Sequence, residues 1–272
     1  MTPSFASDPV RLALVVLAAI AGSAVNSIAG GGTLLTFPAL VGLGVPAITA
    51  NATSTVALWP GTVASAWGYR DLLSGMRTWV VAFAIPSLLG GLVGALLLLV
   101  TPPSRFDAIV PWLVLGATLL FLIQRPLSER LRQRAERSAV APEPVDDHTF
   151  DRAVRPSLRL LAYQFAVAVY GGYFGAGMGI LMLAALGFMG FRNIHRMNGL
   201  KNWGGLCANA VAAGTFAVSG LVSWPVAAAM AIGAAIGGYG GSRLAQRVPQ
   251  TRVRQAIIVI GFASALWLVT RT

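Results

Sequence analysis

Residues 74–94 read SGMRTWVVAFAIPSLLGGLVG, and residues 219–241 repeat this pattern as SGLVSWPVAAAMAIGAAIGGYGG. Both stretches begin with Ser-Gly-x-x-x-Trp, continue as an apolar run and end in Gly-Gly-x-x-Gly. The repeat continues, because Pro102 and Arg105 recur as Pro249 and Arg252. The chain is therefore a tandem duplication. In an apolar membrane protein, two homologous halves usually hold a substrate site between them near the middle of the bilayer, so the duplication indicates a transporter.

Composition assigns the chain to the polytopic α-helical membrane proteins. Hydrophobic residues make up 56% of it, charged residues only 11%, and many apolar runs are long enough to approach a membrane span. The net charge of +11 does not indicate nucleic acid, because the arginines lie in loops between apolar segments, where they set topology. No signal peptide is expected at the N-terminus. Tryptophans at segment ends are typical of interfacial anchors, as for Trp79, Trp112 and Trp224.

Each half is predicted to contain five helical segments. In the first half they cover residues 11–29, 30–43, 46–69, 76–100 and 106–123, and in the second half 157–174, 177–190, 194–217, 221–243 and 252–270. The second segment of each half has about 14 residues, roughly 21 Å, whereas a hydrocarbon core is about 30 Å thick. We interpret this segment as one arm of a re-entrant or broken glycine-rich hairpin. The predicted units are two transmembrane repeats, 1–123 and 157–272, and a charged linker, 124–156, with a short surface helix over 124–137 as one option.

The distribution of arginines predicts the topology. With five segments per half, all arginines except Arg11, Arg105 and Arg271 fall on one side. The positive-inside rule then predicts a multi-pass membrane protein with a cytoplasmic linker and both termini outside. An odd number of segments inverts the second repeat relative to the first. We therefore predict an all-α polytopic fold of two inverted-topology repeats whose hairpins meet near the midplane. Glycine-rich faces on the fourth segments leave a homodimer open.

A glycine cluster follows the first segment of each half. Glycine lets the chain turn sharply and leaves backbone N–H groups open to a ligand. Helices that begin at these turns would aim their positive dipole ends at the protein centre, which favours an anion. The glycines of the fourth segments we assign instead to close helix packing. The substrate-binding residues predicted in the two hairpins are Asn26, Gly30, Gly31, Gly32, Thr33, Gly175, Gly177 and Gly179.

The third segment of each half begins with polar residues, and in the second half these include Lys201, the only lysine of the chain. An ammonium group at the bilayer centre costs about 2.5 to 3.5 kcal/mol, so such a group usually faces a cavity and has a partner. The alternative is that Lys201 snorkels to the cytoplasmic surface, since Arg196 is only five residues earlier. We favour the cavity. The further predicted substrate-binding residues are Asn51, Thr53, Ser54 and Thr55 in the first half, and Asn198, Lys201 and Asn202 in the second.

The acidic residues indicate the charge of the substrate. All nine lie at Asp8, Asp71, Asp107 or in the linker, so no segment interior carries the carboxylate that a cation pathway would normally need. The segments do contain a lysine, hydroxyls, amides and helix N-termini, and these groups can bind an anion. The two histidines are far apart and there is one cysteine, so no metal site is expected. No Ser-His-acid arrangement is supported, and we expect neither an enzyme nor a cofactor.

Three motifs follow one another along the chain, before Trp224 and the late Gly-Gly-x-x-Gly. They are Asn26-x3-Gly30-Gly31-Gly32-x5-Pro38-x-Leu40, Asn51-Ala52-Thr53-Ser54 and Asn198-Gly199-Leu200-Lys201-Asn202. In this order the chain resembles the sulfite exporter or TauE/SafE-like permease family, over about residues 11–270. The resemblance implies transport of sulfite, organosulfonates or related small anions, commonly out of bacterial cells. The second half departs from the family pattern, because it has Gly177-Met178-Gly179 and Ala184 in place of Pro38.

We therefore expect a carrier that exports a small sulfur-containing anion by alternating access, with the anion and the lipid bilayer as its partners. An inside-negative potential of about 100 mV favours anion exit by roughly 2.3 kcal/mol per charge, so export needs no further coupling. A passive small-anion channel or a carboxylate carrier would use the same site. A hypothesis of another class is a membrane-embedded accessory or sensor subunit that holds a partner through its basic linker.

Overall fold

The described part of the chain folds as helices joined by short turns. The computed structural model describes residues 8–138, 155–188, 191, 193–244 and 250–271. The first half consists of α1 (Pro9–Ala29), α2 (Thr33–Gly42), α3 (Ala47–Gly68), the short 3₁₀ helix η2 (Arg70–Leu73), α4 (Arg77–Val100) and α5 (Pro103–Ser138). The second half consists of α7 (Leu158–Tyr173), α8 (Met178–Phe188), α9 (Ile194–Val218), α10 (Trp224–Leu244) and α11 (Gln250–Arg271). Within these residues the predicted segments and the two short second helices are confirmed.

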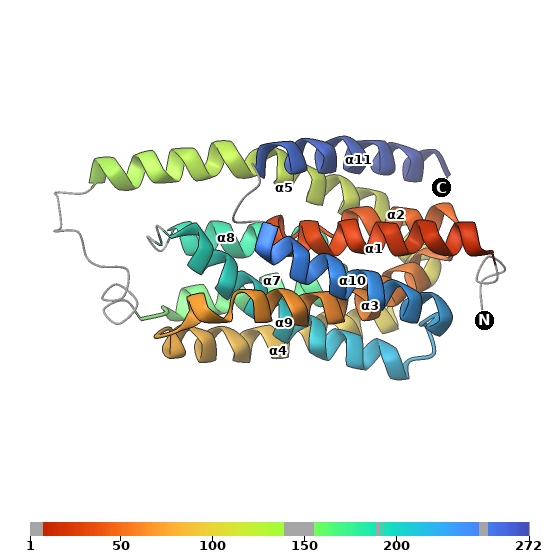
Figure 1. Ribbon diagram of the computed structural model, residues 1–272, viewed down its shortest axis with the longest axis horizontal. Coiled ribbons are helices and arrows are strands. Elements are labelled where there is room, and N and C mark those ends of the chain that lie inside the picture. The colour runs from red at the N-terminus through yellow and green to blue at the C-terminus, as the bar shows by residue number, and fades with distance from the viewer. Residues whose placement is uncertain (1–7, 139–154, 189–190, 192, 245–249, 272) are drawn as a thin grey trace.

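The helix α5 differs from the prediction. It runs without a break from Pro103 to Ser138, so the predicted fifth segment and the predicted surface helix form a single helix of 36 residues. The residues after Pro126 are rich in Leu, Arg, Gln and Glu, which favour helix, and contain no glycine or further proline that would end it. The end of α5 extends past the other helices (Figure 1). Linker residues 139–154 lie outside the described residues.

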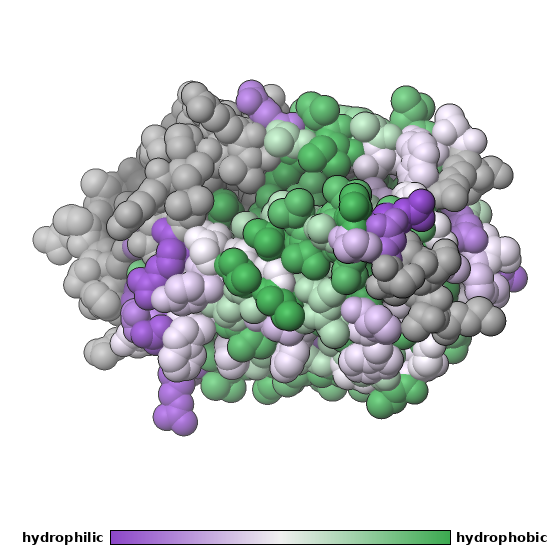
Figure 2. Space-filling model, turned by 45° about the vertical axis from the view of Figure 1, so that its right-hand side comes forward, coloured by the Kyte–Doolittle hydropathy of each residue, from purple (hydrophilic) through white to green (hydrophobic). Residues whose placement is uncertain are grey.

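The surface is that of a protein embedded in a membrane. Three helical stretches are long and apolar enough to span a bilayer, namely Pro9–Ile28, Arg77–Val100 and Pro103–Ile123. On the face drawn in Figure 2, apolar residues form a central band and polar residues gather toward the two ends. The start of α1 and the end of α11 lie at one end of the molecule, and the end of α5 lies at the other (Figure 1). Large exposed apolar side chains on four helices include Leu14, Leu97, Ile232 and Leu266.

The two Ser-Gly-x-x-x-Trp motifs diverge after their glycines. Gly75 and Gly220 form the same turn, with φ of 84° and 79°. Trp224 is 55% exposed, but Trp79 is completely buried, and its ring centroid lies 4.8 Å from that of Phe191. The prediction of an interfacial anchor was therefore wrong for Trp79. The reason is that α10 starts two residues later after its turn than α4 does, so the buried Val226, not Trp224, takes the position that Trp79 has in α4.

The fourth helix of each half packs against helices of the other half. Helix α4 lies against α7 and α9, and α10 lies against α1 and α3. A Cβ atom added to Gly91 would come within 2.8 Å of the Ala208 Cα, and one added to Gly238 within 2.8 Å of the Gly61 Cα. The interpretation of these glycines as close-packing residues is confirmed. Because these glycines face helices of their own chain, the homodimer stays a prediction with no support from them.

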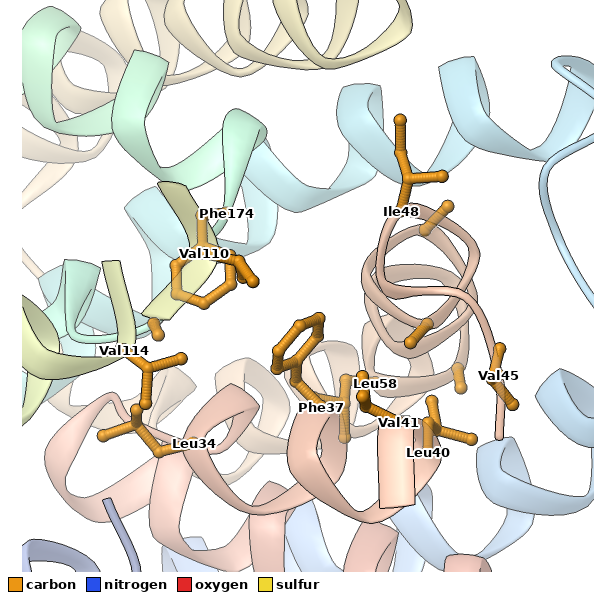
Figure 3. Close-up of a cluster of buried hydrophobic side chains, with 14 of the residues drawn as sticks. Leu34, Phe37, Leu40, Val41, Val45, Ile48, Leu58, Val110, Val114 and Phe174 are labelled. Atoms are coloured by element: carbon orange, nitrogen blue, oxygen red, sulfur yellow. The ribbon is translucent and has the colours of Figure 1, made fainter. Parts of the chain in front are cut away.

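Helix α2 is held in the main apolar core. The ring of Phe37 meets that of Phe174, the residue after α7, edge to face with centroids 5.5 Å apart. The short helix therefore packs against the end of α7 in the second half, which brings the two predicted hairpins together. Figure 3 shows this core, in which α2 contributes Leu34, Phe37, Leu40 and Val41, α3 contributes Ile48 and Leu58, and α5 contributes Val110 and Val114.

Candidate anion-binding site

Lys201 lies in the interior of the protein, with only 3% of its surface exposed. Its ammonium group donates hydrogen bonds to two backbone carbonyls of the last turn of α1, Asn26 O at 3.1 Å and Ser27 O at 2.9 Å. Carbonyls at a helix C-terminus carry the negative end of the helix dipole, so they stabilise a cation. Asn202 Nδ2 adds a bond of 3.2 Å to Ser27 O. Lys201 thus does not reach the surface, and in the described part of the chain no carboxylate pairs with it.

The two glycine hairpins meet next to Lys201. Gly30 ends α1 with a φ of 83°, and its N–H bonds back to Asn26 O at 3.0 Å. This left-handed conformation suits glycine, and the absent side chain allows the second hairpin to approach. A Cβ atom on Gly179 would lie 2.7 Å from the Gly30 Cα and 3.0 Å from the Lys201 Cδ. The two backbones are therefore in direct contact, one from each half of the chain.

The start of α8 supplies a backbone donor at this place. Gly179 is the second residue of α8, so its N–H is one of those that have no acceptor inside the helix. Among the described residues no other group accepts a hydrogen bond from it. The N-terminus of a helix carries partial positive charge and favours anions. Gly179, with its open N–H, thus lies against the aliphatic part of the Lys201 side chain.

A small cavity lies at the junction of the halves. Its volume is about 10 Å³, which is room for roughly one water molecule. Among the predicted site residues it brings together Asn26, Gly30, Gly179, Lys201 and Asn202. The sequence analysis missed four further residues of its wall, which are Thr62, Met178, Gly205 and Asn209.

The sequence does contain a signal for two of the missed residues. Asn209 follows Lys201 by eight residues, so both lie on one face of α9, with Gly205 between them. Thr62 occupies the matching place on α3, because Thr62 and Asn209 have the same separation in sequence as Gly91 and Gly238. Extending the polar pattern of the third segments by two helical turns would have found this pair.

The polar cluster of α3 bonds to neighbouring parts of the protein and does not line this cavity. Asn51 Nδ2 donates to Tyr173 O at the end of α7, at 2.9 Å. Thr53 Oγ1 accepts from the Ser223 N–H just before α10, at 3.0 Å. These two bonds tie α3 to the second half. Within the first half, the hydroxyls of Ser54 and Thr36 bond to each other at 2.6 Å, and that of Thr55 donates to Asn51 O at 2.9 Å. Their predicted role in substrate binding stays a prediction.

The remaining predicted hairpin residues surround the cavity without lining it. A Cβ atom on Gly32 would come within 2.9 Å of the Asn26 Cβ. Gly31 packs against the ring of Phe121. Gly175 and Gly177 have φ of 84° and 79° and form the turn between α7 and α8. Thr33 lies beside this turn, since its Oγ1 is 3.7 Å from where a Gly175 Cβ would be. In α9, the buried Asn198 Oδ1 has no hydrogen-bond partner in the described residues.

Comparison with known proteins identifies the family. The sulfite exporter TauE/SafE family matches residues 14–268. The chain belongs to this family. Three similar proteins are described as probable membrane transporter proteins: ORF9 of a Sinorhizobium species, 26% identical over 94% of this chain and 92% of the relative; a Haemophilus influenzae protein, 26% identical over 92% and 91%; and YfcA of Escherichia coli K12, 27% identical over 94% and 88%. No solved structure matches the chain. The chain is a membrane transporter of the TauE/SafE family.

Proposed function

We propose that this transporter carries a small sulfur-containing anion, sulfite or an organosulfonate, through the cavity beside Lys201. The observation that carries the proposal is the buried ammonium of Lys201, which lines a cavity between the two halves and pairs with no carboxylate in the described residues. The family description supports the substrate class, since it names sulfite. The names of the relatives support transport and specify no substrate.

Charge complementarity supports an anion. The two carbonyls that accept from Lys201 are neutral groups, so a net positive charge remains in the cavity. They use two of the three ammonium N–H donors, which leaves the third for a ligand. The N–H of Gly179 at the start of α8 is another donor for the same ligand. Sulfite and sulfonates carry three oxygens that accept several charge-assisted hydrogen bonds, so they match this set of donors.

The size of the cavity supports a mechanism of alternating access. Room for about one water molecule does not accommodate sulfite or a sulfonate, so the anion binds only when the cavity walls separate. The walls come from both halves, with Asn26, Gly30 and Thr62 on one side and the start of α8 and the face of α9 on the other. We propose that the two inverted repeats separate toward one membrane face and then toward the other around this site.

The proposed direction is export from the cytoplasm across the bacterial inner membrane. The connection between α3 and α4 lies at the same end of the molecule as the extension of α5 (Figure 1), and Arg70 begins η2 within it while Arg77 begins α4 directly after it. The positive-inside rule makes this end cytoplasmic. An anion then leaves the cell down the membrane potential, which contributes about 2.3 kcal/mol per charge at 100 mV.

The proposal is tested by anion binding to the purified protein. Thermal shift is measured with sulfite, sulfate, thiosulfate, taurine, sulfoacetate and acetate, for the wild type, Lys201→Met and Arg105→Met. Arg105 is an exposed cation and serves as the matched control for loss of a positive charge. We expect a sulfur oxyanion to stabilise the wild type and Arg105→Met but not Lys201→Met. Equal stabilisation of all three proteins would remove Lys201 from the binding site, and a preference for acetate would make the protein a carboxylate carrier.

Transport in proteoliposomes separates the remaining hypotheses. A carrier shows saturable uptake and counterflow, whereas a passive channel shows neither saturation at low concentration nor counterflow. Transport that survives deletion of residues 128–150 would contradict the hypothesis of an accessory subunit that acts through its linker.

A further inference from the structure

We infer that Asn209 is a specificity-determining residue, and that the transporter selects a monoanionic sulfonate with a hydroxyl group at its other end. The inference rests on the proposed function, because it takes the sulfonate group of the ligand to bind at Lys201 and identifies Asn209 as the residue that binds the other end of the ligand. It starts from the polar residues of the cavity wall that the binding of a sulfonate group does not use.

Lys201, Gly205 and Asn209 form a continuous stripe along α9. They are spaced at i, i+4 and i+8, so they share one face of the helix, and all three line the cavity. Gly205 between them has no side chain, and a Cβ atom there would only reach ordinary contact with Met178 Cε, at 3.7 Å. The stripe thus has the charged Lys201 at one end, a glycine without a side chain in the middle and the polar Asn209 at the other end.

The polar end is free to bind a ligand. Asn209 is only partly buried, and its carboxamide forms no hydrogen bond with the described residues. Thr62 on α3 lines the same cavity, and its hydroxyl already donates to Leu58 O at 3.1 Å. Its oxygen is therefore left as an acceptor, while the amide of Asn209 offers both an acceptor and donors. Both groups are neutral.

This chemistry selects among sulfonates. A hydroxyl group donates to the Thr62 or Asn209 oxygen and accepts from the Asn209 amide, so it satisfies both residues. A methyl group at the same place would displace water from these polar atoms and leave them without partners, which weakens binding. A second carboxylate or sulfonate would meet no cation in this part of the wall. The ligand that fits is therefore a monoanion with a hydroxyl tail.

The test compares two ligands of equal charge and similar size, 2-hydroxyethanesulfonate and propane-1-sulfonate, in which a hydroxyl replaces a methyl group. Dissociation constants are measured by calorimetry for the wild type, Asn209→Leu, Thr62→Val and Lys201→Met, with sulfite as a third ligand. We expect the wild type to bind the hydroxyl ligand at least fivefold more tightly than the methyl ligand. Asn209→Leu should bring the ratio of the two dissociation constants close to one, because only the hydroxyl ligand loses hydrogen-bond partners. Both constants are measured on the same protein sample, so a loss of folded protein does not change their ratio. Thr62→Val should reduce the preference in part.

The outcomes separate the inference from the proposed function. If sulfite binds in a Lys201-dependent manner but the wild type binds both sulfonates equally or not at all, the inference is wrong and the proposed function stands. If the wild-type preference persists in both Asn209→Leu and Thr62→Val, the hydroxyl is recognised elsewhere and the inference is also wrong. If no anion binds, or if Lys201→Met binds all of them like the wild type, both proposals are overturned.

Discussion

Helices α3 and α9 occupy matching places in the two halves, yet their polar residues do different things. Ser54 and Lys201 have the same separation in sequence as the packing glycines Gly91 and Gly238. Ser54 bonds to Thr36 within the first half, whereas Lys201 lines the cavity between the halves. The two helices thus carry different side chains at this matching position, of which Ser54 contributes to packing and Lys201 to the proposed binding chemistry. The two helices have corresponding neighbours, since α3 packs against α10 and α9 packs against α4, so the difference lies in the side chains.

The largest expected effect is that of Lys201→Met on anion binding. Removing the ammonium takes away the charge that the anion would pair with, so affinity for sulfite should fall by at least roughly thirtyfold. Calorimetric dissociation constants for the variant and the wild type measure this change. Lys201→Arg keeps the charge but needs more room, so it should bind more weakly than the wild type and more tightly than Lys201→Met. An unchanged affinity in Lys201→Met would make Lys201 as purely structural as Ser54.

Gly179→Ala tests the contact between the two hairpins. The added methyl group would lie 2.7 Å from the Gly30 Cα and 3.0 Å from the Lys201 Cδ, so the hairpins must separate. We expect a loss of about 1 to 3 kcal/mol in stability, seen as a lower Tm in detergent, together with weaker anion binding. Gly187→Ala is the control in the same helix, since its methyl group would lie 3.7 Å from Met197 Cε. Equal Tm values for the two variants would contradict the close contact.

Gly91→Ala and Gly238→Ala test whether the two halves are equivalent in packing. Each added methyl group would approach a backbone Cα within 2.8 Å, at Ala208 in one case and at Gly61 in the other. We expect similar losses of stability, about 1 to 2 kcal/mol each. Gly240→Ala in α10 meets no atom within 4 Å and should leave the Tm unchanged or raise it. A large effect at only one of the two sites would show that one fourth helix packs more tightly than the other.

The smallest expected effect is that of Ser54→Ala. The variant loses the 2.6 Å hydrogen bond to Thr36, which should lower stability by about 1 kcal/mol. Because Ser54 does not line the cavity, the affinity for sulfite should stay within twofold of the wild type. Thermal denaturation and calorimetry on the same sample measure both. A clearly weaker affinity would return Ser54 to the binding site, as the sequence pattern alone predicts.

The glycines illustrate what a local sequence pattern can predict about the structure. The fourth-segment glycines and the hairpin glycines were assigned different roles from their places along the chain. The packing role of the first group is confirmed by close backbone approaches. In the second group, the structure brings Gly30 and Gly179 together at the cavity, but it uses Gly31 and Gly32 to pack near Phe121 and Asn26. Runs of glycine indicate that something comes close, and they do not indicate whether it is a ligand, a ring or another backbone.

By itself, the sequence determined the membrane class, the ten helical segments, the two short second helices and the presence of a single lysine among apolar residues. Segment length, apolar content and turn residues are local properties, so they are readable without a structure. Only the tertiary structure decided that Lys201 bonds to the end of α1, that Trp79 is buried, and that Asn209 and Thr62 share a cavity. These contacts join residues far apart in sequence. They depend on how the helices pack and on small register shifts, such as the later start of α10, which no local pattern encodes.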